Sequence, residues 1–164
     1  MAQKARLYIA EALLILMEDQ KFEDIRIQDL TKKAGVSRMT YYRYFADKSE
    51  VLDYYMNYIF DLFMEDDDKN GAPFNSIEHI IQCLEFFREY GHFALCLYNA
   101  GMEGIMLKAI NKYMYNRLDG DERQSLKAYR YYSYAGTIYN CYMQWVVENF
   151  RTDVKSIAKI IQHA

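Results

Sequence analysis

Basic and aromatic side chains crowd one short segment of an otherwise acidic chain. Residues 31–48 contain five Lys or Arg and one Asp, a local charge of +4, whereas the whole chain of 164 residues has a net charge of −3. A local positive patch of this kind indicates a local anionic partner rather than general affinity for polyanions. The segment also holds four aromatic residues between 41 and 45, which either form a buried seam or face that partner.

Two short helices joined by a tight turn are predicted around this patch. Residues 27–34 have room for about two helical turns, and Gly35 stands where a residue with positive φ ends a helix. Ser37 is a natural N-cap for the second helix, and Asp47 is one for the helix after it. A leading helix at 3–19 has apolar residues at helical spacing, so the three helices predict a helix-turn-helix head.

The aromatic residues of this head divide into two predicted sets. Tyr41 and Phe45 are four apart, so they share one helical face and can pack in a small core with Leu30. Such spacing leaves six side chains on the exposed faces: Arg38, Met39, Thr40, Tyr42, Arg43 and Tyr44. This surface suits a DNA groove, because Arg donates to guanine, Thr and Met meet a thymine methyl, and Tyr hydroxyls reach phosphates. Lys48 begins the next helix, whose N-terminus favours a phosphate.

The stretch "IQDLTKKAGVSRMTYYRYFADKSEVL" resembles the DNA-binding signature of the TetR family of transcriptional regulators. The resemblance covers roughly residues 5–52, and many spaced positions agree together. They are Phe22, Asp29, Leu30, Ala34, Gly35, Val36, Ser37, Thr40, Tyr42, Tyr44, Phe45 and Lys48. Two positions depart from the pattern. Arg26 stands where a Thr is common and is expected to reach a phosphate itself, and Met39 replaces a common Gly and is expected to alter base preference.

The resemblance implies an all-α fold of about nine helices in two domains. Residues 1–47 would be the helix-turn-helix DNA-binding domain, and residues 48–164 a helical ligand-binding and dimerisation domain. The expected function is a sequence-specific transcriptional repressor, acting as a homodimer on double-stranded operator DNA and released by a small apolar or aromatic ligand. The residues expected to contact DNA are Arg26, Ser37, Arg38, Met39, Thr40, Tyr42, Arg43, Tyr44 and Lys48.

The remainder of the chain also reads as helical, with one Pro and seven Gly in all and 52% hydrophobic residues. Helices are predicted at 48–64, 76–89, 122–149 and 153–162, with one short and one longer helix between 91 and 118. The acidic run followed by Gly and Pro at 65–75 predicts a solvated loop.

Most of the 17 Tyr and nine Met residues lie in this second part of the chain. They either fill the core or line a ligand site. Eight aromatic or Met residues fall in segments that line the pocket of related regulators, and these are the predicted ligand contacts: Phe60, Phe63, Phe86, Phe87, Tyr98, Met102, Met106 and Tyr113.

The predicted helix at 122–149 carries a stripe of apolar and small residues that is wider than one contact face needs. Gly136 beside Ala135 would let another helix approach closely. The stripe indicates either a fully buried helix of a monomer or a dimer surface, and the two-fold symmetry of helix-turn-helix proteins favours the dimer. The predicted interface residues are Tyr132, Gly136, Tyr139, Asn140, Met143, Val147, Ile157 and Ile161.

Other chemistries lack the residues that they need. No phosphate-binding Gly loop, HExxH or nucleophile elbow occurs, so neither an enzyme nor a cofactor is expected. His79–Cys83 and His92–Cys96 have helical spacing that could serve zinc, but packing is the favoured interpretation and no metal site is predicted. Three widely spaced Cys, no signal peptide and no apolar run of ~20 residues predict a cytoplasmic protein without membrane association.

Three function classes stay open at this level. The first is the ligand-responsive repressor, and the second is a DNA-binding regulator controlled by a protein partner or acting without a ligand. The third is a helical ligand-binding dimer that no longer binds DNA.

Overall fold

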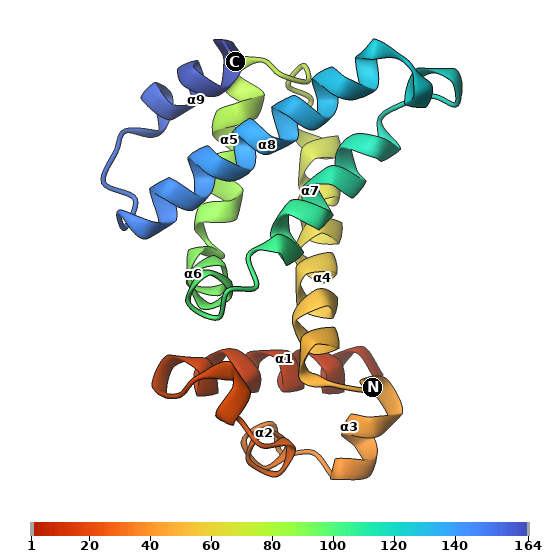
Figure 1. Ribbon diagram of the computed structural model, residues 1–164, viewed down its shortest axis with the longest axis vertical. Helices are drawn as coiled ribbons and strands as arrows, with labels where there is room; N and C mark the ends of the chain where they lie inside the picture. Colours follow the sequence, from red (N-terminus) through yellow and green to blue (C-terminus); the bar gives the residue numbers. More distant parts are fainter. Residues whose placement is uncertain (1, 164) are drawn as a thin grey trace.

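Nine α-helices and two short 3₁₀ helices make up the computed structural model, which describes residues 2–163 and contains no strand within them (Figure 1). In chain order the elements are α1 (Ala2–Asp19), η1 (Phe22–Asp24), α2 (Ile27–Lys33), α3 (Arg38–Tyr44), α4 (Lys48–Asn70), α5 (Ile77–Arg88), α6 (Gly91–Asn99), α7 (Gly104–Asn116), η2 (Asp121–Gln124), α8 (Leu126–Val147) and α9 (Val154–His163). Over the same residues, no helix combines the length and apolarity needed to cross a bilayer.

The breaks between the first four helices follow the predicted local signals. Gly35 adopts φ +66 after α2, a conformation that costs glycine little. The Ser37 hydroxyl accepts a hydrogen bond from the Thr40 amide at 3.0 Å and so caps α3. The Asp47 carboxylate caps α4 by accepting from the amide of Ser49 at 2.8 Å. These contacts confirm the predicted helix-turn-helix boundaries.

The acidic run after residue 64 is helical, so the prediction of a solvated loop at 65–75 is wrong over its first part. α4 continues to Asn70 and ends only at Gly71, where φ is +65. Carboxylate side chains are compatible with a helix, and the backbone meets no helix-breaking residue before that Gly. The helix also gains from Asp67, whose side chain is only 13% exposed and pairs with residues of α5 and of the segment after α7.

The long helix near the C-terminus begins later than predicted. Residues 121–124 form η2, and the Ser125 hydroxyl then accepts from the Lys127 amide at 3.1 Å to start α8. At its other end the buried Trp145 donates from Nε1 to the Thr152 carbonyl oxygen at 2.8 Å. This bond fixes the turn between α8 and α9.

One continuous hydrophobic core runs through the molecule. Tyr41 and Phe45 of α3 are buried in it together with Leu30 of α2, as predicted. Figure 1 shows α1 lying across the lower end of α4, while the upper part of α4 runs alongside α7. We call residues 2–47 the head and residues 48–163 the body. α4 is the element that belongs to the packing of both.

Candidate nucleic-acid interface and body cavity

The outer side of α3 is the exposed face of the head. Met39 is 77% exposed and Tyr42 61% exposed, and Arg43 is also exposed. Arg38 is exposed as well and donates to the Gln28 side-chain oxygen at 2.7 Å, which links α3 to α2. We call Arg38, Met39, Tyr42 and Arg43 the α3 face. Two cations, a thioether and a phenol are thus presented together on a helix whose opposite side is buried.

Tyr44 does not belong to the α3 face, although the sequence placed it there. It is half-buried, and the Arg6 guanidinium of α1 lies 5.3 Å from its ring centroid. The same guanidinium lies 5.4 Å from the ring centroid of Tyr54 in α4. Cation–π contacts of this kind hold α1, α3 and α4 together. The spacing of Tyr44 from Tyr41 placed it near the core side of the helix, and that signal was available in the sequence.

Lys48, the first residue of α4, is half-buried and makes contacts that the sequence did not predict. Its ammonium donates to the carbonyl oxygens of Phe22, of Glu23 at 3.2 Å and of Ile25 at 2.7 Å. Burial lowers the pKa of this ammonium. The three bonds tie the start of α4 to η1, so in this geometry Lys48 joins head to body, and its predicted phosphate contact stays untested.

Three other predicted DNA contacts have local partners in the head. Arg26 pairs with Asp29 at 2.8 Å while remaining 78% exposed. The hydroxyls of Ser37 and Thr40 lie 2.9 Å apart at the first turn of α3, where Ser37 serves as the cap. The Arg26 guanidinium is thus paired but largely open to solvent, whereas the two hydroxyls serve the helix itself.

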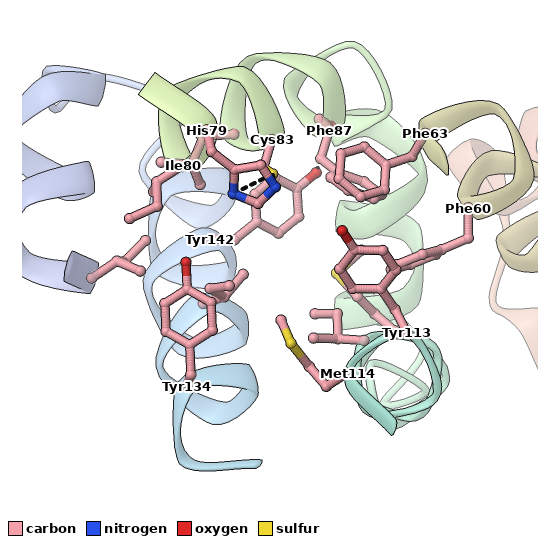
Figure 2. Close-up of a pocket in the computed structure, with 15 residues that line it drawn as sticks. Phe60, Phe63, His79, Ile80, Cys83, Phe87, Tyr113, Met114, Tyr134 and Tyr142 are labelled. Carbon is pink, nitrogen blue, oxygen red and sulfur yellow. Dashed lines mark hydrogen bonds between the residues drawn. The ribbon is translucent and has the colours of Figure 1, made fainter. Parts of the chain in front are cut away.

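An apolar cavity of about 50 Å³ lies in the body, lined by residues of α4, α5, α7, α8 and α9 (Figure 2). Aromatic and aliphatic side chains form most of its wall, and the surface that they present to the cavity is apolar. The lining residues are Phe60, Phe63, His79, Ile80, Cys83, Leu84, Phe87, Met106, Ile110, Tyr113, Met114, Tyr134, Ile138, Tyr142 and Ile161. We call this space the body cavity.

Five of the eight predicted ligand residues line the body cavity: Phe60, Phe63, Phe87, Met106 and Tyr113. The other three do not. Phe86 packs behind the wall, with its ring centroid 5.4 Å from that of Phe63, and Tyr98 is 47% exposed on α6. Met102 is half-buried and absent from the lining.

Sequence reasoning missed the contribution of α8 to this wall. Tyr134, Ile138 and Tyr142 recur every four residues and so form a second stripe on the helix whose other face was assigned to a dimer. The signal that could have found them was that spacing.

A polar network sits beside the body cavity, centred on Asp67. One carboxylate oxygen accepts from the Tyr113 hydroxyl at 3.0 Å and from Arg117 at 2.9 Å. The other lies 3.1 Å from Nε2 of His79, which is 3% exposed. Burial raises the pKa of Tyr113, so its phenol is a stable donor. The network joins α4, α5 and α7 at a point that the sequence had assigned to a loop.

The pH dependence of stability is expected to report on His79. Burial is the main cause that lowers its pKa; the Asp67 carboxylate opposes this shift and the Arg117 guanidinium adds to it. The Cys83 thiol and the Tyr113 hydroxyl also lie in this cluster. Below about pH 6.5, the His79 imidazole is protonated in the unfolded chain but stays neutral to lower pH in the folded chain. Protonation therefore favours the unfolded state, and the free energy of unfolding falls as the pH falls. Urea unfolding between pH 7 and pH 5 should show a smaller loss for His79→Gln. Equal slopes for parent and variant would contradict this assignment.

The two predicted His–Cys pairs are contacts within single helices. The Cys83 thiol lies 3.7 Å from Nε2 of His79, and the Cys96 thiol lies 3.7 Å from Nε2 of His92. Burial raises the pKa of Cys83 to about 12 and that of Cys96 to about 11, so both stay thiols. Across the described part of the chain, no group of three or more His, Cys, Asp or Glu side chains is placed to hold a metal.

The predicted dimer residues separate into exposed and buried sets. Tyr132 and Val147 are 43% and 45% exposed, Asn140 is exposed, and Gly136 and Tyr139 are partly exposed. The other three are buried within the chain's own core, and we remove them from the proposed interface: Met143, Ile157 and Ile161. Three large apolar residues outside the predicted interface are also exposed: Leu126 and Tyr129 of α8, and Ile160 of α9, at 79%, 75% and 62%.

Comparison with known proteins finds a short similarity. No family model matches the chain. A stretch of 37 residues, 23% of this chain, is 51% identical to the HTH-type transcriptional regulator EthR of Mycolicibacterium smegmatis. The match spans only 17% of that protein's length. Over that segment the chain is therefore similar to a helix-turn-helix transcriptional regulator.

Proposed function

We propose that this protein is a DNA-binding transcriptional regulator of the TetR type, with residues 1–47 as the DNA-binding domain and 48–164 as the ligand-binding and dimerisation domain. The observation that carries the proposal is the α3 face. Arg38, Met39, Tyr42 and Arg43 are all exposed on a short helix whose other side is locked into the core. The 37-residue similarity to a helix-turn-helix regulator supports the same conclusion.

The α3 face has the chemistry that reads a major groove. In this proposal Arg38 and Arg43 donate to guanine, and Met39 offers an apolar surface to a thymine methyl. Arg26 adds a phosphate contact at the edge of the head. The test is a mobility-shift assay with DNA flanking the protein's own gene, against an excess of unrelated DNA. If unrelated DNA competes for the protein as well as the flanking DNA does, the result would contradict sequence-specific regulation.

The body cavity supports control of DNA binding by a small ligand, with release of a repressor as the expected outcome. A ligand acts on DNA affinity only if it binds one conformation better than another. α4 lines part of the cavity, and its first residues also pack against the head. Binding of a ligand in the cavity can therefore affect the position of the head through this helix. Regulation by a protein partner remains the second candidate, favoured by the exposed apolar residues of α8 if these do not form a dimer.

A homodimer formed through the exposed side of α8 is the proposed assembly. A Cβ atom at Gly136 meets open space in the single chain, because nothing lies within 4 Å of it. Gly136→Leu is therefore expected to fold well but to block a close approach of the partner's helix, shifting sedimentation at micromolar concentration from dimer to monomer. Gly104→Leu is the matched control, since its Cβ also meets open space. A monomeric parent, or a dimeric Gly136→Leu protein, would contradict this interface.

A further inference from the structure

One polar atom in the wall of the body cavity has no partner among the described residues. The Tyr134 hydroxyl oxygen is buried and makes no hydrogen bond, although Tyr134 lines the cavity (Figure 2). A buried hydroxyl left unpaired destabilises a fold, and such groups are uncommon in native proteins. The ring itself is fixed by packing, with its centroid 5.8 Å from that of Phe74.

The other polar groups of the wall already have partners. The Tyr142 hydroxyl donates to the Phe87 carbonyl oxygen at 2.7 Å. The Tyr113 hydroxyl donates to Asp67, and the His79 ring lies between Asp67 and the Cys83 thiol. The surface that the cavity presents is apolar throughout, so the unpaired Tyr134 hydroxyl on the α8 side becomes reachable for a bound molecule only when the wall moves.

Charge balance around the cavity selects against an ionised molecule. The Asp67 carboxylate is paired with the Arg117 guanidinium at 2.9 Å, and buried His79 is neutral at pH 7. An ionised ligand would find no unpaired opposite charge here, and a buried charge without a partner is strongly unfavourable.

The size of the cavity sets a further condition. An engineered protein cavity of about 150 Å³ holds one benzene molecule, whereas the body cavity measures about 50 Å³. A molecule of one ring can enter only if a wall moves outward. Tyr113 of α7 stands opposite Tyr134 across the cavity and is bonded to α4 through Asp67, so movement of that wall pulls on α4 (Figure 2).

We propose that the body cavity binds a small neutral molecule with an apolar, single-ring body and one hydrogen-bonding group that pairs with the Tyr134 hydroxyl. This assignment rests on the proposed function in treating that molecule as the effector. The hydrogen bond to Tyr134 gives the site its selectivity. Outward movement of Tyr113 transmits ligand binding to α4.

Phenol and toluene are the probes, because they differ only in a hydroxyl that replaces a methyl. Calorimetric titration of the protein without DNA gives the ratio of their affinities, and the same ratio is measured for Tyr134→Phe. We expect the ratio of phenol affinity to toluene affinity to be about tenfold lower in Tyr134→Phe than in the parent, the usual effect of one buried hydrogen bond. The comparison of ratios removes the difference in hydration between the two probes. Tyr134→Phe deletes only an unpaired hydroxyl, so it should unfold at the same or a higher temperature than the parent.

Three results would overturn the proposal. They are no binding of either probe, an unchanged affinity ratio in Tyr134→Phe, and binding of benzoate more tightly than phenol. Because these titrations contain no DNA, they are independent of the mobility-shift assay. Phenol binding by a protein that fails to retard DNA would retain the ligand site and reject the regulator, and the reverse outcome would reject only the ligand site.

Discussion

Asp67→Ala is expected to lower the free energy of unfolding by about 3 kcal/mol, the low end of the range for breaking a buried ion pair. The substitution leaves the Arg117 guanidinium and the buried His79 ring without their carboxylate, and it removes the acceptor of the Tyr113 hydroxyl. The loss stays near the low end because the Arg117 side chain is 32% exposed and water can reach it. Urea unfolding followed by circular dichroism measures the change.

Glu65→Ala is the matched control for this experiment. It removes the same charge from the same helix, but Glu65 is exposed and should change stability by less than about 0.5 kcal/mol. Asp67→Asn should fall between the two, because an amide oxygen still accepts from Tyr113 while the ion pair is lost. Equal stability of the Asp67→Ala and Glu65→Ala proteins would show that the network does not hold α4, α5 and α7 together.

The double variant Arg38→Ala, Arg43→Ala is expected to lose at least about 30-fold in affinity for the DNA that the parent retards, since each bidentate guanine contact contributes about 1–3 kcal/mol. The variant should still fold, because both side chains are exposed on the α3 face. Titrations by fluorescence anisotropy at several salt concentrations give both the affinity and its salt dependence. If the arginines contact phosphates instead, the slope of log K against log salt falls by about two and sequence preference survives.

Lys155→Ala, Lys159→Ala serves as its control, because it removes two exposed positive charges from α9, far from the head in Figure 1. Its DNA affinity should match that of the parent. Parent-like binding by the Arg38→Ala, Arg43→Ala protein would show that the α3 face is not the DNA-reading surface.

The head was largely predictable because local chemistry determines it. Gly35, Ser37 and Asp47 each act on backbone groups within three residues, so their types and spacing suffice to place the breaks. The spacing of Tyr41 and Phe45 likewise identified the buried side of α3. The spacing of Tyr44 from Tyr41 indicated its half-buried side, but the partners of Tyr44 and Lys48 depend on how α1, η1 and α4 cross, which no single segment encodes.

The body was less predictable for the same reason. The run at 65–70 has the composition of a loop, and it is helical partly because Asp67 meets His79 and Arg117, residues 12 and 50 positions away along the chain. The cavity wall on α8 depends on which face of that helix turns inward. Apolar residues occur on both faces, so composition alone assigned Met143 to a partner when it belongs to the core.

The length of α4 has a mechanical consequence. Its 23 residues span roughly 35 Å as a single helix. Lys48 fastens the lower end to η1, and Asp67 fastens the upper end to the cavity wall. A rigid rod of that length that tilts by about 5° about one end moves the other by about 3 Å. In a dimer the two heads would move in opposite senses, and the separation of their α3 faces would change by up to about 6 Å, nearly two base-pair steps of about 3.4 Å.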